Sequence, residues 1–233
     1  MCLRMSKSSI NAATAVAAVP GPYSGGQVLA RDTHGEKVIR TSDGLFVKLF
    51  RHKRLFSSSR LFPYAKRFAS NARMLARLGI PTVEVENVFS VPGIRRDIAL
   101  YRPLKGKTLR DLARETPEAM PYVLPRLARC LALLHERGIL FRSIHFGNVI
   151  VTPEGVGLID VADIRRRPFG SLSIGQRLRN FGHMLRYAKD RQILLDYGID
   201  RFLQHYAAAA SVSPAQLARL AKPLQNLAEH SGA

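Results

Sequence analysis

Cysteine and tryptophan are the residues that this chain has least of. Its two cysteines, Cys2 and Cys130, are too few for a disulfide framework or a cysteine-based metal cluster. Cys130 falls in an apolar helical pattern and is expected to be a buried small hydrophobe. Tryptophan is absent and aromatic residues make up 8% of the chain. This composition disfavours nucleic acid as a partner, because single strands bind to aromatic stacking platforms.

Long hydrophobic runs are also lacking. No stretch approaches the ~20 apolar residues that a membrane-spanning helix requires. An alanine-rich run within residues 1–19 is short and is only a weak match to a secretory signal. We therefore expect a cytoplasmic protein in which residues 1–26 form a disordered tail, with the Pro- and Gly-rich stretch 20–26 marking the start of the ordered domain.

Acidic residues are scarce: 17 Asp and Glu stand against 36 Lys and Arg, which gives a formal net charge of +19 at pH 7. Residues 51–77 and 164–188 carry many of the basic side chains and no acid, so neither run can form internal i,i+4 ion pairs. Taken alone, either run is compatible with a solvated helix face. Together they predict an anionic partner: an acidic membrane surface, nucleic acid, or a phosphorylated or carboxylate-rich substrate.

Hydrophobic residues make up 46% of the chain, enough for a sizeable core. Strand patterns and one helix come first and helical patterns follow, which predicts an α+β fold with two lobes: a small N-terminal antiparallel sheet plus a helix, then a helical lobe. We place the N-terminal lobe at residues 27–103 and the C-terminal lobe at 104–233. The strands are expected at 27–31, 36–40, 45–50, 83–91 and 98–101, and the helices at 63–78, 109–115, 123–137, 174–187, 192–209 and 214–229.

The segment from Leu140 to Asp160 is the most informative part of the sequence. It predicts a loop, a strand, a tight Pro-Glu-Gly turn and a second strand, with Asn148 and Asp160 at the strand ends. A hairpin brings these two residues, twelve positions apart, to the same place. Amide and carboxylate oxygens bind Mg²⁺ together with phosphate oxygens and water. The pair is therefore compatible with a Mg²⁺ site, although Asn148 could also cap a turn and Asp160 could simply end a strand.

In this element order, Phe-Arg-Ser-Ile-His-Phe-Gly-Asn at 141–148 followed by Leu-Ile-Asp at 158–160 resembles the protein-kinase-like fold. More narrowly, it resembles the bacterial lipopolysaccharide core kinase (Kdo/WaaP-type) family, and within it the toluene tolerance protein group. The resemblance covers about residues 27–190. It implies an ATP- and Mg²⁺-dependent phosphotransferase that phosphorylates a core sugar at the cytoplasmic face of the inner membrane. The implied partners are an anionic glycolipid or another phosphorylated acceptor, with peripheral contact to the acidic membrane surface.

The resemblance also assigns roles to residues. It implies that Lys48 contacts the α- and β-phosphates of ATP, that the loop ending at Gly35 covers the phosphates, and that Asn148 and Asp160 ligate Mg²⁺. From the residues alone, Lys48 could also be a surface lysine, although the apolar residues on both sides of it in the strand favour the functional role. Gly35 could belong to a plain hairpin turn, because a loop with one glycine cannot wrap phosphates closely.

The chain departs from the kinase pattern at Ser143, which stands where a kinase has its catalytic aspartate. A serine hydroxyl has no useful basicity near neutral pH. His145 and Asp163 are candidates for the missing base, and Arg142 or the cluster Arg165–Arg167 for stabilising the transferred phosphoryl group. The alternatives are that His145 is a structural histidine and that Asp163 is a turn residue paired with an arginine.

A pseudokinase that binds nucleotide or anionic glycolipid and regulates envelope assembly is the competing hypothesis. Ser143 favours it. Asn71 does too, because it stands where a kinase helix carries the glutamate that pairs with the lysine. An amide can hydrogen-bond to an ammonium group but supplies no countercharge. Asn71 is equally compatible with an ordinary exposed helix position.

Overall fold

The computed structural model describes residues 27–32, 35–51, 63–91 and 96–230. The tail predicted at residues 1–26, which contains Cys2, lies outside the described residues, and so do residues 33 and 34 of the predicted phosphate-covering loop. Contacts between residues divide the chain into two compact units. The first comprises Met1–Met74 and Val83–Pro103, and the second Leu75–Thr82 and Leu104–Ala233.

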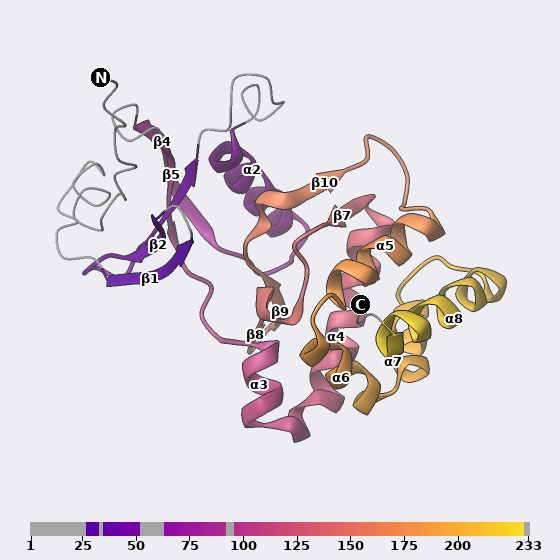
Figure 1. The fold of residues 1–233 in the computed structure, drawn as a ribbon. Helices are drawn as coiled ribbons and strands as arrows, with labels where there is room; N and C mark the ends of the chain where they lie inside the picture. The colour runs from indigo at the N-terminus through magenta and orange to yellow at the C-terminus, as the bar shows by residue number, and fades with distance from the viewer. Residues whose placement is uncertain (1–26, 33–34, 52–62, 92–95, 231–233) are drawn as a thin grey trace, which may run out of the picture. The chain divides into compact units, whose positions relative to one another are not determined.

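The first unit is built on an antiparallel sheet (Figure 1). The strands lie in the order β1-β2-β3-β5-β4. Their bounds, with that of the helix between β3 and β4, are β1 (Gln27–Asp32), β2 (Gly35–Arg40), β3 (Phe46–Arg51), α2 (Tyr64–Arg77), β4 (Glu84–Val91) and β5 (Arg96–Arg102). The first three strands and the helix were predicted to within one residue at each end.

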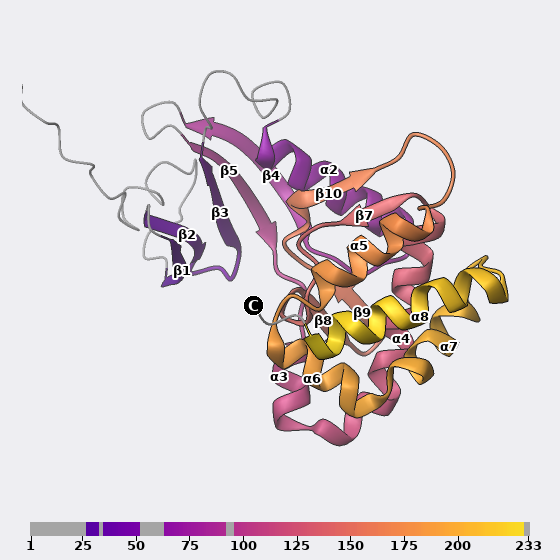
Figure 2. The ribbon, with the colours of Figure 1, turned by 45° about the vertical axis from the view of Figure 1, so that its right-hand side comes forward.

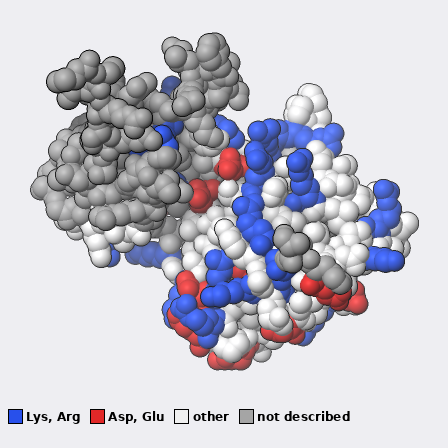
Figure 3. Space-filling view, in the orientation of Figure 1, with Lys and Arg blue, Asp and Glu red and all other residues white. Residues whose placement is uncertain are grey.

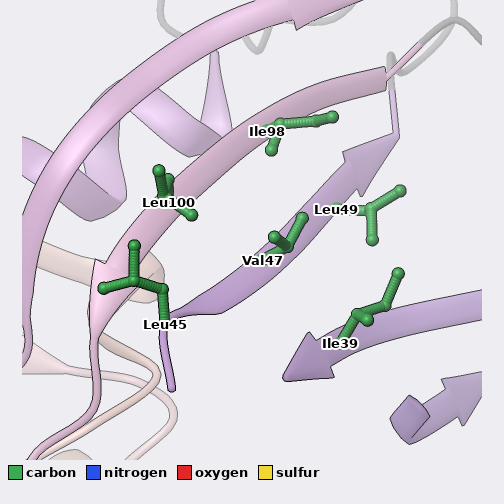
Figure 4. Packing of buried hydrophobic residues seen from close by; sticks show 6 residues of the cluster. All are labelled: Ile39, Leu45, Val47, Leu49, Ile98 and Leu100. Carbon is green, nitrogen blue, oxygen red and sulfur yellow. The ribbon is translucent and has the colours of Figure 1, made fainter. Parts of the chain in front are cut away.

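The two faces of this sheet carry different kinds of side chain. Successive side chains point to opposite faces, so that one face carries six buried aliphatic side chains (Figure 4): Ile39, Leu45, Val47, Leu49, Ile98 and Leu100. The opposite face carries aromatic rings. On this face the Phe68 ring of α2 lies 5.8 Å from the Phe50 ring and 5.3 Å from the Tyr101 ring, measured between centroids. α2 therefore covers the face on which Lys48 lies.

The second unit is mainly helical (Figure 2). In its helix α4, Leu124, Leu127 and Leu131 are fully buried. The helix α8 packs against α5, α6 and α7. The helices are α3 (Leu109–Glu115), α4 (Met120–Glu136), α5 (Ile174–Met184), α6 (Ala188–Tyr197), α7 (Ile199–Ala207) and α8 (Pro214–His230), with short 3₁₀ turns η2 (Pro117–Ala119), η3 (Phe146–Asn148) and η4 (Val161–Asp163).

Short strands lie between α4 and α5, and one more, β6, precedes α3. One antiparallel sheet has the order β6-β8-β9, and a separate antiparallel pair joins β7 and β10. Their bounds are β6 (Lys107–Thr108), β7 (Ile139–Phe141), β8 (Val149–Thr152), β9 (Gly155–Leu158) and β10 (Ile164–Arg166). The predicted hairpin after the loop is therefore confirmed. The α+β class is confirmed as well, with an antiparallel sheet first and helices afterwards.

Several boundaries differ from the prediction. Helix α4 begins at Met120 rather than at residue 123. Its first turn can contain Pro121, because the N–H that proline lacks would have no intrahelical partner at that position. The helix predicted at 174–187 ends at Met184. The helix predicted at 192–209 is two helices, because Gly198 between α6 and α7 adopts a φ of 97°, which continues no α-helix. Cys130 is half-buried rather than buried, although its surroundings raise the pKa of the thiol to about 12 by desolvation.

Candidate functional site

The two predicted metal ligands lie at one end of the β8–β9 hairpin. Val149 and Leu158 are the last paired residues at that end. Just beyond them, the Ile159 N–H donates a hydrogen bond of 3.0 Å to the Asn148 carbonyl. Asn148 thus directly precedes the first strand and Asp160 follows the second by two residues. Asn148 and Asp160 therefore lie at the same end of the hairpin.

The side chain of Asn148 is held by the loop that precedes it. Asn148 ends the 3₁₀ turn η3, has 9% exposure, and donates from Nδ2 to the Ser143 carbonyl at 2.8 Å. Because the amide nitrogen is used in this bond, the amide oxygen is the atom that can ligate a cation. The loop residues 143–148 therefore fix the orientation of the amide.

Asp160 has an unusual backbone. Its φ of 54° and ψ of 43° lie in the left-handed region, and among the described residues it is the one non-glycine with a positive φ. Aspartate tolerates this conformation better than most residues. Strained dihedral angles persist where the surrounding structure enforces them, and such positions cluster at functional sites. The conformation places the half-buried Asp160 carboxylate at the turn between β9 and η4.

Ser143 contacts an acidic side chain. The pairing of β7 with β10 sets Phe141 opposite Ile164, so that the residues after β7 lie beside those before β10. The Ser143 hydroxyl donates to Asp163 Oδ2 at 3.3 Å, and the Arg142 N–H donates to the Asp163 carbonyl at 3.4 Å. A carboxylate therefore lies within hydrogen-bond reach of Ser143, the residue that the resemblance aligns with the catalytic aspartate of a kinase.

His145 is tied into its own loop. Its Nδ1 accepts a hydrogen bond of 3.1 Å from the Gly147 N–H, and its ring packs edge-on against the Tyr187 ring with centroids 5.0 Å apart. Burial, and then the nearby Arg110 guanidinium, lower the pKa of the imidazole below its usual value. These contacts are those of a structural histidine, which is one of the two interpretations that the sequence allows.

An ion pair that the sequence analysis missed supports the same loop. Asp190 is fully buried and accepts two hydrogen bonds of 2.7 Å from the Arg110 guanidinium, which raises the pKa of Arg110. Its Oδ2 also accepts the Phe146 N–H at 3.0 Å. One signal was present in the sequence: Asp190 is the first acid after the acid-free run 164–188.

The arginines predicted to contact phosphate are on the surface. Arg142 is exposed, and its carbonyl accepts a hydrogen bond of 2.7 Å from Arg186. The side chains of the cluster Arg165–Arg167 are also exposed. Arg167 donates to the Ser171 carbonyl at 3.0 Å. Figure 3 shows Lys and Arg side chains gathered in a band on the visible face of the second unit.

Lys48 belongs to the first unit and is not a surface lysine. It is 6% exposed, and its Nζ lies 5.4 Å from the centroid of the Phe68 ring and 5.7 Å from that of the Phe50 ring. Lysine is almost never buried without an interaction of its charge. Asn71 lies half-buried on α2. Gly35 pairs with Asp32 at the end of the β1–β2 hairpin, and the two residues between them lie outside the described part of the chain.

The residues at this site fit Mg²⁺ only if a bound phosphate compound and water supply further oxygen atoms. Among the described residues, no group of three or more His, Cys, Asp and Glu side chains could hold a metal ion. Asn148 and Asp160 offer an amide and a carboxylate oxygen, and Mg²⁺ commonly takes one or two protein oxygens and completes its octahedron with phosphate oxygens and water. The residues present therefore fit a nucleotide-bound cation. They do not fit a cage made of protein ligands alone.

Comparison with known proteins gives a limited match. No protein-family model matches the chain. A Clostridium perfringens protein named "probable serine/threonine-protein kinase" is 35% identical over 98 residues. The match covers 39% of this chain and 14% of that protein, so the chain corresponds to only a small part of its relative. Together with the order of the elements, this similarity supports a protein-kinase-like fold.

No described helix combines the length and the apolar character needed to cross a lipid bilayer.

Proposed function

We propose that this protein is an ATP- and Mg²⁺-dependent phosphotransferase of the lipopolysaccharide kinase type, acting on a core sugar at the cytoplasmic face of the inner membrane. A kinase-like phosphotransferase in general has the support of the partial similarity to a protein named as a kinase. The observation that carries the proposal is the position of Asn148 and Asp160 at one end of a single hairpin, with Asp160 in the left-handed conformation.

Each proposed role follows from the chemistry of the residue. Mg²⁺, when bound, would neutralise charge on the phosphate oxygens. Asn148 and Asp160 would hold the cation through oxygen atoms, and the hydrogen bond from Asn148 to the Ser143 carbonyl would keep the amide oriented. Lys48 would bind the α- and β-phosphates as a compact positive charge. The Gly35 loop would cover the phosphates.

The acceptor class follows from charge. The exposed arginines Arg142, Arg165 and Arg166 would hold the anionic groups of a glycolipid or another phosphorylated acceptor. The overall positive charge would keep the protein at an acidic membrane surface, since each basic residue near such a surface contributes about 1 kcal/mol of attraction. Peripheral attachment at the inner membrane is part of the proposal.

A transfer assay tests the proposal. Wild type is incubated with γ-labelled ATP, Mg²⁺ and core oligosaccharide, beside Asp160→Asn and the control Asp200→Asn. Asparagine also tolerates a left-handed backbone, so Asp160→Asn removes the charge and leaves the turn intact. Asp200 is exposed in the first turn of α7.

We expect Asp160→Asn to lose transfer at least about 100-fold, since metal stabilisation of charge is worth several kcal/mol. Asp200→Asn should match wild type. Equal transfer by Asp160→Asn rejects the proposal.

Ser143 favours a second candidate, a pseudokinase that binds nucleotide or anionic glycolipid and regulates envelope assembly. Thermal unfolding in the presence of Mg-ATP distinguishes the two, because a ligand that binds only the native state raises the melting temperature. A rise in melting temperature without phosphoryl transfer selects the pseudokinase. A rise with transfer selects the enzyme.

A further inference from the structure

We propose that Asp163 is the general base of this protein, a role moved from the usual catalytic-loop position, now Ser143, to a residue that follows the proposed metal ligand Asp160. The inference rests on the proposed phosphotransferase function and goes beyond it by naming the residue that accepts the proton. Its central observation is the hydrogen bond of 3.3 Å from the Ser143 hydroxyl to Asp163 Oδ2.

Strand pairing explains why these two residues meet. β7 ends at Phe141 and β10 begins at Ile164, and the two are direct partners across the antiparallel pair. Ser143 follows β7 by two residues and Asp163 directly precedes β10. The Arg142 N–H bond to the Asp163 carbonyl extends the pairing by one step. The pairing of β7 with β10 therefore holds the Asp163 carboxylate beside Ser143, and this contact involves no residue of the first unit.

The Asp163 carboxylate keeps capacity for a substrate. An ionised carboxylate has about four acceptor sites on its two oxygens, and the serine hydroxyl uses one of them. Asp163 is half-buried, so part of the residue is exposed to solvent. Ser143 acts as a positioning residue: its hydroxyl donates to the carboxylate and restricts the side chain to one orientation.

The other candidates for the base are excluded by their contacts. His145 accepts the Gly147 N–H at Nδ1, so its proton is on Nε2 and the ring has no lone pair to offer. Asp190 is fully buried and accepts hydrogen bonds from Arg110 and Phe146. Asp160 is the proposed metal ligand. Among the residues that the structure describes, Asp163 is the remaining carboxylate in contact with this loop.

The proposed step is balanced with a nucleoside triphosphate as phosphoryl donor. The acceptor hydroxyl gives its proton to the Asp163 carboxylate, and the acceptor oxygen forms a bond to the γ-phosphorus. The bond from that phosphorus to the β–γ bridging oxygen breaks, and the nucleoside diphosphate leaves. Water can replace the sugar hydroxyl as acceptor, so the same base also serves slow hydrolysis of the triphosphate.

The test follows both transfer to core oligosaccharide and hydrolysis of Mg-ATP by water, so that it does not depend on the natural acceptor. It compares wild type, Asp163→Asn, the double variant Ser143→Asp/Asp163→Asn, Ser143→Ala and the control Asp200→Asn. The melting temperature with and without Mg-ATP is measured for each protein.

We expect Asp163→Asn to lower turnover by about 10²- to 10⁴-fold, the usual contribution of a general base, while the Mg-ATP-induced rise in melting temperature stays at the wild-type value. The double variant returns a carboxylate to the usual kinase position, and its turnover should be at least about tenfold higher than that of Asp163→Asn. Ser143→Ala, which removes only the positioning contact, should lose several-fold.

If Asp163→Asn turns over at the wild-type rate, this inference is overturned and the proposed enzyme function stands. If Asp163→Asn loses both turnover and the Mg-ATP-induced rise in melting temperature, Asp163 is a structural residue and the inference is again overturned. Failure of the double variant to recover any activity also counts against it. Absence of both transfer and hydrolysis in wild type overturns the proposed enzyme function and this inference with it.

Discussion

At the scale of single residues, the loop Arg142–Asn148 depends on side chains that come from outside it. Asp190 accepts hydrogen bonds from the Phe146 N–H and from two nitrogen atoms of the Arg110 guanidinium. The partners differ in exposure: the Asp190 side chain is fully buried, whereas that of Arg110 is 30% exposed. Removing one member of a buried ion pair leaves the other charge uncompensated, and the penalty is larger for the charge that water cannot reach.

This asymmetry predicts unequal costs for two substitutions. Arg110→Met should lower the free energy of unfolding by about 3–5 kcal/mol, because it leaves the Asp190 carboxylate buried and unpaired. Asp190→Asn should cost less, about 1–3 kcal/mol, because the amide oxygen can still accept the Phe146 N–H and Arg110 can turn towards water. Denaturant unfolding measures both values. Equal costs, or a larger cost for Asp190→Asn, would contradict the asymmetry.

His135 lies in a second network of single residues, at the end of α4. It is fully buried, with Nδ1 2.8 Å from the Tyr206 hydroxyl and Nε2 3.1 Å from Asn180 Oδ1. Arg177 donates to the Tyr206 oxygen, so the Tyr206 proton points to Nδ1, and Nε2–H donates to Asn180. Asn180 in turn donates to the Phe141 carbonyl at 2.8 Å. The network thus connects α4, α5 and α7 to the strand that leads into the loop.

Burial lowers the pKa of His135 from 6.5 to about 3, which predicts a pH dependence of stability. Between these two values the unfolded chain binds a proton at this site and the folded protein does not. Stability is therefore complete above pH 6.5 and falls as the pH is lowered, by up to ~1.4 kcal/mol per pH unit. Other groups titrate in the same range, so the measurement compares wild type with His135→Gln by denaturant unfolding at pH 7, 5.5 and 4.5. The stability gap between the two proteins should narrow on acidification. A constant gap would refute the assignment.

Residue contacts could be predicted from the sequence only where they are local. Asn148 and Asp160 flank one hairpin, and the short Pro-Glu-Gly turn sets their approach. The contact between Ser143 and Asp163 requires the pairing of β7 with β10, which the sequence does not specify, and Asp163 could only be named as one of two candidate bases. Arg110 and Asp190 meet because α3 packs near α6. Nothing in the spacing of the chain encodes such a contact.

At the scale of elements, the β8–β9 hairpin depends on one close approach. A Cβ built on Gly157 would lie 2.6 Å from the Pro81 carbonyl oxygen and 2.4 Å from a methyl carbon of Leu104. The contact is structural, since the Leu158 N–H donates to the Pro81 carbonyl at 2.9 Å and Thr82 forms a bridge to Leu158. β9 can reach this segment only because residue 157 has no side chain.

Gly157→Ala should therefore destabilise the protein by about 1–3 kcal/mol, the usual cost of overpacking. It should also shift β9, and with it the segment leading to Asp160. Gly175 provides a matched control: it lies in the first turn of α5 with an ordinary φ and nothing within 4 Å of a built Cβ. Gly175→Ala should be neutral or stabilise by up to about 1 kcal/mol, because alanine restricts the unfolded chain. Thermal unfolding compares the two, and similar effects of both substitutions would refute the steric argument.

Element boundaries could be predicted where local signals agree. Thr108 caps α3 through a hydrogen bond to the Asp111 N–H, and the predicted range 109–115 is the observed one. Gly79 ends the segment after α2 with a φ of 71°. The prediction failed between α6 and α7, where apolar residues continue at helical spacing past Gly198. An isolated glycine inside such a pattern is usually tolerated, so the sequence did not signal the positive φ that Gly198 adopts.

At the scale of the whole molecule, charge is the dominant feature. The formal net charge is +19, and much of the excess lies in two runs that hold no acid. Ion pairs among the described residues, such as those of Arg110 and Arg177, use only some of the arginines. Self-repulsion of like charges destabilises a folded chain and is screened by salt. An anionic ligand adds a separate effect, because binding to the native state stabilises it by mass action.

These two effects can be separated by comparing salts at equal ionic strength. Raising NaCl from 0.01 M to 0.15 M shortens the screening distance from about 30 Å to about 8 Å. It should raise the melting temperature by several degrees, at about 2–4 °C per kcal/mol of relieved repulsion for a chain of this size. Sodium phosphate at the same ionic strength should raise the melting temperature further if the basic runs bind phosphorylated groups, and that extra rise should saturate with phosphate concentration. A melting temperature that does not respond to NaCl would mean that the folded charges do not repel one another. An identical response to both salts would remove the argument that this positive charge recognises a phosphorylated acceptor.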